Sequence, residues 1–211
     1  MTEFDKRVAE LKEQLANVPK LLDKSRPQRV KESKKSIFYM VKTYFQHHIG
    51  DTKKETSYFR NYIHQNIDKI IKEHKTALFT AYRGAAKTTT ITNFFVLWET
   101  IKKTRKYIVI ISASNTLAVS ILELIKTELE DNINLKSDFN IEIVTSRVND
   151  IIVKVDGELL KIEAFGAGAK LRGTRFLSYR PDLIILDDIE NDENVLSKAY
   201  RDKLENWYKK A

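Results

Sequence analysis

Residues 76–90, TALFTAYRGAAKTTT, decide the fold that the sequence predicts. Thr76–Tyr82 is a short β-prone run, and residues 88–102 have the spacing of an amphipathic helix, with one apolar face made of Ile91, Phe94, Phe95 and Trp98. A turn that leads from a strand into a helix points backbone N–H groups at a bound anion. The stretch therefore predicts a phosphate-binding loop within an α/β domain.

The loop matches the phosphate-loop pattern G-x-x-x-x-G-K-[ST] only in part. The frame starts at Ala81 and ends at Ala86, Lys87 and Thr88, so alanine stands at both glycine positions. Such a loop still works if neither alanine needs a positive φ, and Gly84 is kept inside it. Lys87 would reach the β- and γ-phosphates, and the Thr88 hydroxyl would bind Mg²⁺. Taken alone, these residues also fit a tight turn whose lysine and threonine cap the helix.

Residues 180–193, RPDLIILDDIENDE, form the second motif. The apolar run Leu183–Leu186 leads directly into Asp187 and Asp188, as in a buried strand whose carboxyl end presents an acid to Mg²⁺. A second carboxylate can polarise the attacking water. Alone, the motif also fits an acidic, solvated turn. Because ligands of open parallel sheets bind at the carboxyl ends of strands, the two motifs together favour a nucleoside triphosphatase site.

The rest of the pattern predicts alternating strands and helices. Tyr107–Ser112 is almost wholly apolar, as expected for a strand covered on both faces, and Thr116–Asn132 has helical spacing. Asn149–Val155 and Leu159–Phe165 form a predicted hairpin with its turn at Asp156-Gly157. We expect an α/β P-loop NTPase of the RecA/ASCE-like kind over residues 36–211, with a mainly parallel sheet flanked by helices.

Residues 1–35 form a predicted N-terminal helical arm. Its apolar residues follow heptad spacing: Phe4, Val8, Leu11, Leu15, Val18 and Leu22. Pro19 should end or kink the helix near Val18. The arm either packs on its own domain or binds a partner or a second copy of the chain. Ser25, Pro27 and the basic residues after them are typical of a connector.

The composition limits the class of protein. The chain has 211 residues, enough for one domain or at most two, and 42% are hydrophobic, so it can bury a core. It has no cysteine, and it has no apolar segment of the kind that forms a signal peptide or spans a membrane. The net charge is +8, and without the six acids of residues 182–193 it is +14. This charge favours a polyanionic partner.

Residues 36–75 alternate aromatic and basic side chains. The part from Tyr58 to Ile71 has the spacing of an amphipathic helix. His47 and His48 invite a metal hypothesis, but adjacent histidines are poorly spaced for one ion, and no acid or cysteine stands at ligand spacing from them. The sequence therefore gives little support to a metal site at these histidines.

Several stretches together resemble the N-terminal ATPase domain of the large terminase subunit, the DNA-packaging motor of tailed bacteriophages and herpesviruses. The likeness covers residues 40–195. The stretches that carry it are YRGAAKTT in the loop, residues 107–132, FGAGAKLRGTR at 165–175, and RPDLIILDDIENDE. Residues 44–67 resemble the segment that helps to hold the adenine end of the nucleotide. The second motif and the glycine- and arginine-containing stretch before it are the most specific part.

The resemblance implies roles for the loop residues. Lys87 would contact the β- and γ-phosphates, and Arg83 would sense the γ-phosphate or couple hydrolysis to movement. Thr88 and Asp187 would hold Mg²⁺. The residues expected around ATP are Arg83, Gly84, Ala85, Ala86, Lys87, Thr88 and Thr89.

The catalytic carboxylate and the arginine finger stay open at this point. The family has glutamate directly after the metal-binding aspartate, whereas this chain has Asp188 there. Asp188 is favoured by position as the base, and Glu190 is the alternative. Arg172, or second to it Arg175, would be offered to a neighbouring subunit, unless these arginines contact DNA phosphates or a local carboxylate.

The function implied by the resemblance is Mg²⁺-dependent ATP hydrolysis that drives double-stranded DNA into a procapsid, in the cytoplasm of an infected bacterial host. The implied partners are double-stranded DNA, the portal protein and the small terminase subunit, with a homo-oligomeric ring on the procapsid, a monomer in isolation and no membrane. Only 18 residues follow Glu193, too few for the nuclease domain and the later coupling motif of large terminases. We therefore expect a trimmed motor fragment, ahead of a split gene or a degenerate prophage copy.

Other functions compete with this one. The nearest is a helicase-like, DNA-stimulated ATPase. A catalytically weak DNA-binding or assembly module would fit the alanines in the loop, and an oligomerisation scaffold would fit the heptad arm.

Overall fold

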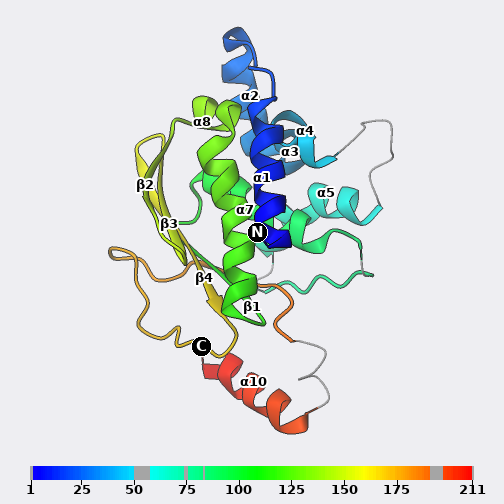
Figure 1. Cartoon of the computed structure of the whole chain (residues 1–211), viewed down its shortest axis with the longest axis vertical. Helices are drawn as coiled ribbons and strands as arrows, with labels where there is room; N and C mark the ends of the chain where they lie inside the picture. The colour runs from blue at the N-terminus through cyan, green and yellow to red at the C-terminus, as the bar shows by residue number, and fades with distance from the viewer. Residues whose placement is uncertain (1, 50–57, 74–75, 83, 191–196, 211) are drawn as a thin grey trace.

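The computed structural model describes residues 2–49, 58–73, 76–82, 84–190 and 197–210, and Figure 1 shows a sheet with helices beside it. The helices before the sheet are α1 (Glu3–Ala16), the 3₁₀ turn η1 (Asp23–Ser25), α2 (Arg26–Lys35), α3 (Ile37–Tyr44), α4 (Gln46–Ile49), α5 (Tyr58–Glu73), the π-helix η2 (Thr88–Phe95) and α6 (Val96–Lys102). The other elements are β1 (Tyr107–Ser112), α7 (Asn115–Asp131), α8 (Ile133–Phe139), β2 (Ile141–Ser146), β3 (Asp150–Val155), β4 (Glu158–Gly166), β5 (Leu183–Leu186) and α10 (Lys198–Lys210). Within the described ranges, no helix is long and apolar enough to cross a membrane.

The five strands of the described residues form one mixed sheet in the order β2-β3-β4-β1-β5. β1 pairs in parallel with β4 and β5, while β2, β3 and β4 pair antiparallel. The predicted α/β class is confirmed, but the predicted mainly parallel sheet is wrong, because two of the four pairings between the described strands are antiparallel. The predicted hairpin is confirmed as β3 and β4. Its turn residues Asp156 and Gly157 have φ values of 44° and 86°, as a two-residue primed turn requires.

Thr76–Tyr82 was predicted as the strand before the loop, and this prediction is wrong for the described structure. Exposure alternates along the segment: Phe79 packs against the core, and Leu78 is 88% exposed. A run of strand-type residues becomes a strand only when a neighbour completes its hydrogen bonds. None of the strands that the structure describes pairs with this segment, so it is extended chain outside the sheet.

Strand β1 is buried along its whole length, which confirms the prediction of a strand covered on both faces. Ile108 and Ile110 belong to the core under the helices, whereas Val109 packs in a second cluster with Leu171 and Phe176. Strand β5 differs from the expectation of a buried strand. It pairs only with β1 among the described strands, and at this sheet edge its residues Ile184 and Leu186 are 47% and 38% exposed.

Helix α1 lies alongside α7, as Figure 1 shows. Its last residue is Ala16, close to the end that Pro19 predicts. Of the heptad residues, Leu11 and Leu15 are buried, whereas Leu22 is 78% exposed. The described structure therefore has the centre of the apolar seam packed on the rest of this chain.

The predicted connector is helix α2, and its basic residues take part in the packing. Arg29 is buried and donates from Nε and Nη2 to the carboxylate of Asp138 at 2.8 and 2.9 Å. The Tyr44 hydroxyl donates to the same carboxylate at 2.6 Å. The indole N–H of Trp98 donates to the Ser33 carbonyl at 2.7 Å. These bonds hold α2 to α8 on one side and to α6 on another.

Candidate functional site

The predicted phosphate loop forms a tight turn at the start of η2. The Ala85 amide donates to the Tyr82 carbonyl at 3.2 Å, and Lys87 Nζ donates to the Ala81 carbonyl at 3.2 Å. Gly84 has a φ of 86° and Ala86 a φ of 57°. Ala81 is outside this left-handed region, so the condition that neither alanine needs a positive φ is met at Ala81 and is not met at Ala86. A left-handed alanine costs about 1–2 kcal/mol, and the turn contains that strain.

The second motif lies next to this loop. The Asp187 amide donates to the Ile111 carbonyl at 2.8 Å, and the Ala113 amide donates to the Asp188 carbonyl at 3.0 Å. These bonds extend the β1–β5 pairing past the strands and fix both acids at the carboxyl edge of the sheet. On η2, the hydroxyl of Thr88 interacts with the Asp187 carboxylate. The structure therefore brings the two motifs together, as the sequence predicts.

Burial raises the pKa of the Asp187 carboxyl above its ordinary value. Hydrogen bonding by Thr88 and Thr92 opposes this shift of the pKa, the charge of Asp188 adds to it, and the charge of Lys87 reduces it. A half-buried acid with a perturbed pKa, beside a lysine and two hydroxyl groups, is typical of a functional site. Thr92 was not among the predicted residues. Its spacing of four from Thr88 on one helix is the signal that would have found it.

The other predicted catalytic residues that the structure describes are exposed. Asp188 and Glu190 are both exposed after β5, and Asp188 has a φ of 50°. Arg172 and Arg175 are exposed residues of the connection between β4 and β5. Arg83 lies outside the described residues.

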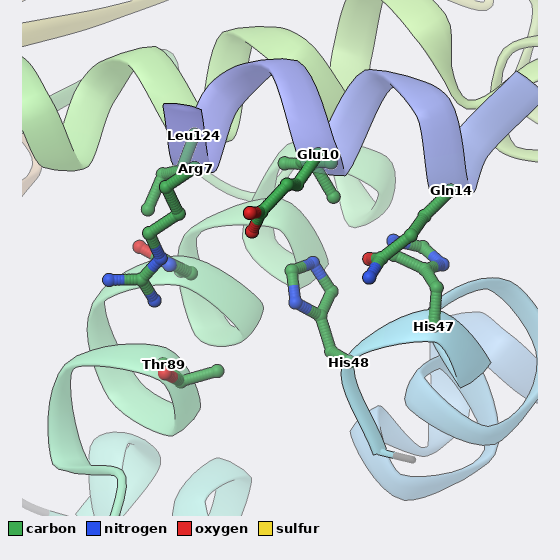
Figure 2. Close-up of a pocket in the computed structure, with 9 residues that line it drawn as sticks. Arg7, Glu10, Gln14, His47, His48, Thr89 and Leu124 are labelled. Carbon is green, nitrogen blue, oxygen red and sulfur yellow. The ribbon is translucent and has the colours of Figure 1, made fainter. Parts of the chain in front are cut away.

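The side chain of Thr89 points to a different site from that of Thr88. Its side chain lines a cavity of about 240 Å³ under helix α1, which Figure 2 shows together with His47 and His48. Thr88 faces Asp187, so consecutive residues of η2 serve two separate polar sites.

The cavity borders a cluster of two partly buried histidines and the buried Glu128, which the sequence did not predict. His47 Nε2 and His48 Nε2 both lie 2.7 Å from Oε1 of Glu128. Asn132 Nδ2 donates to the other carboxylate oxygen at 2.9 Å. Burial disfavours the charged form of Glu128, but the contacts with His47 and His48 outweigh it and hold its pKa below the ordinary value. Glu128 is 80 residues from His48 in the chain, which is why ligand spacing in the sequence did not reveal it.

Comparison with known proteins finds no family model and no curated protein that matches this chain.

Proposed function

We propose that this chain is an ATP-hydrolysing P-loop domain and acts as the motor of a terminase large subunit, which drives double-stranded DNA into a procapsid. The observation that supports it most is the meeting of Lys87, Thr88 and Asp187, because residues 100 positions apart in the chain converge at the carboxyl edge of the sheet. The mixed sheet flanked by helices is compatible with a P-loop-like fold of the RecA/ASCE kind.

The residues present fit a magnesium–nucleotide complex. Thr88 and Asp187 offer neighbouring hard oxygen atoms, the donor type that Mg²⁺ takes in proteins, and Asp187 is only half-buried, so an ion could reach it. Bound Mg²⁺ would neutralise phosphate charge. Lys87 would exchange its bond with the Ala81 carbonyl for a contact with the β- and γ-phosphates, and the loop amides would face phosphate oxygens.

The proposed chemistry is in-line attack of water on the γ-phosphate. Asp188 would orient this water and accept its proton, and Glu190 is the alternative base. Arg83 would sense the γ-phosphate, and Arg172 would act in a neighbouring subunit of a ring. In phosphate-loop enzymes an arginine finger contributes about 10³–10⁵ in rate, so an isolated subunit should turn over slowly. Double-stranded DNA, the portal protein and the small terminase subunit are the partners of this proposal.

Replacement of Lys87 tests the proposal directly. Lys87→Ala should abolish Mg²⁺-dependent phosphate release while the circular dichroism spectrum stays that of the folded protein. Lys69→Ala is the matched control, because Lys69 is an exposed lysine of α5 that pairs with the exposed Glu73. Turnover in Lys87→Ala equal to that of the parent chain would exclude the site.

A second candidate is a catalytically weak DNA-binding or assembly module. The positive φ of Ala86 and the absence of strand pairing for residues 76–82 in the described structure favour it. Titration with a fluorescent ATP analogue separates the two candidates. Saturable binding that requires Mg²⁺ supports the ATPase, and no Mg²⁺-dependent binding supports the weak module.

A further inference from the structure

The cluster of His47, His48 and Glu128 contains none of the residues that would hold Mg²⁺ and the phosphates in the proposed nucleotide site. One ligand atom from each of the three side chains lies within 4.8 Å of the other two. We propose that these residues bind a divalent transition-metal ion of the zinc type, which fastens α4 to α7, and that Glu10 of α1 completes the site.

The burial of Glu128 is the first support. Its exposed fraction is 2%, and an ionised carboxylate in such a place needs a positive partner. Within the residues that the structure describes, its ion-pair partners are His47 and His48. An imidazole is positive only when protonated, whereas a divalent cation supplies the charge while both imidazoles stay neutral. A metal ion therefore meets the charge requirement of the carboxylate.

The geometry of the three side chains is the second support. Both Nε2 atoms converge on a single carboxylate oxygen at 2.7 Å, although the histidines are adjacent in the chain. Ligands about 2.0–2.1 Å from a tetrahedral zinc ion lie roughly 3.3 Å apart, so small side-chain rotations suffice. Asn132 holds the other oxygen of Glu128 at 2.9 Å and is itself 1% exposed. Such outer hydrogen bonds orient metal ligands.

The cavity beside the cluster supplies access and a further ligand. It has a volume of about 240 Å³, and residues of α1, α4, η2 and α7 line it. Figure 2 shows Glu10 and Gln14 of α1 entering the cavity on the side of His48 and His47. Glu10 is exposed and lies outside the group of three, so its carboxylate would have to turn toward the ion to raise the set to two nitrogen and two oxygen ligands.

This ligand set selects the class of metal. Imidazole nitrogens suit zinc, cobalt, nickel and copper, whereas Mg²⁺ and Ca²⁺ prefer oxygen ligands alone. The cluster is therefore chemically distinct from the Thr88 and Asp187 pair. The ion would join α1, α4 and α7, which are separated in the chain, and would stabilise their packing through linkage.

Titration with ZnCl₂ by calorimetry, after dialysis against a chelator, tests the proposal. We expect one saturable site per chain, a rise in Tm with ZnCl₂, and the visible absorption of tetrahedral Co²⁺ when CoCl₂ replaces zinc. His48→Gln should weaken binding at least about tenfold, and Glu128→Gln should do the same. His48 is the safer variant, because its side chain is 23% exposed whereas that of Glu128 is 3% exposed.

Two controls make the result decisive. Glu123→Gln changes a carboxylate of the same helix α7 that pairs with Lys126, and it should bind zinc like the parent chain. Asp187→Asn removes the proposed magnesium ligand and should still bind zinc like the parent chain. A wrong zinc proposal can therefore be distinguished from a wrong nucleotide-site proposal. Glu10→Gln should weaken binding less than His48→Gln. No saturable binding by the parent chain, or equal affinity in the parent chain and His48→Gln, would overturn the proposal.

Discussion

Asp138 and Asp187 are both shielded carboxylates, but their surroundings differ. Asp138, 4% exposed, receives two N–H bonds from Arg29 and one O–H bond from Tyr44, and the pairing raises the pKa of Arg29. Asp187 has a second acid beside it, and its pKa is raised by burial. The first carboxylate is fully paired and holds helices together. The second is left under-compensated, which is the condition in which a bound cation is favoured.

The largest expected effect concerns Asp138. Asp138→Ala leaves the Arg29 guanidinium buried without its partner and should lower the free energy of unfolding by about 3–5 kcal/mol. Urea denaturation measures this. Asp131→Ala is the matched control, since the Lys12–Asp131 pair is exposed and 3.8 Å apart, and it should change stability by less than about 1 kcal/mol. Similar losses of unfolding free energy in both variants would show that the buried pair stabilises the fold no more than the exposed pair does.

Substitution of Asp187 is expected to raise the free energy of unfolding, whereas substitution of Asp138 lowers it. Its folded-state pKa is raised above the ordinary value of 3.8, so the parent chain loses stability as the pH rises through the interval between these two values. Asp187→Asn should therefore be more stable than the parent chain at pH 7, and the difference should shrink as the pH approaches 3.8. Chemical denaturation from pH 8 to pH 4 measures it.

Activity provides the second readout of the same variant. Asp187→Asn should lose Mg²⁺-dependent ATP turnover in spite of its higher stability. A variant that is less stable than the parent chain at neutral pH would mean that Asp187 is compensated like Asp138, and the contrast between the two carboxylates would fail.

The smallest expected effect concerns the left-handed alanine. Ala86→Gly relieves the strain at a φ of 57° but increases the freedom of the unfolded chain, so a net stabilisation of about 0.5–1 kcal/mol is expected. Ala85→Gly is the control, because Ala85 has no positive φ and is buried, and it should destabilise by about the same amount. Thermal denaturation of both variants measures the pair. Equal destabilisation by both glycines would show that the turn is unstrained.

The elements that the sequence predicts well are those with a strong periodic pattern of their own. The strand at Tyr107–Ser112, the helix over residues 116–132 and the hairpin turn at Asp156-Gly157 all match the structure within a residue or two. Residues 76–82 have strand composition as well, but a strand also needs a partner, and partners are set by the whole fold.

The residues of the candidate sites likewise fall into those that local sequence patterns predict and those that they do not. Lys87, Thr88 and Asp187 follow local patterns that place them at the ends of elements, so their meeting is predictable. The approach of Glu128 to His47 and His48 depends on how α4 lies against α7, and no local pattern contains that information. The positive φ of Ala86 likewise depends on the path of the turn, and it cannot be predicted from the fact that the residue is alanine.

The continuous helix formed by η2 and α6 connects the Asp187 site with the N-terminal helix α2. Its first turn carries Thr88 beside Asp187, and ten residues later Trp98 is bonded to the Ser33 carbonyl of α2. Together η2 and α6 span 15 residues and about 20 Å. If the proposed nucleotide site is right, a small rotation at the Thr88 end of this helix would displace its Trp98 end against α2, so nucleotide binding would be linked mechanically to the N-terminal helices.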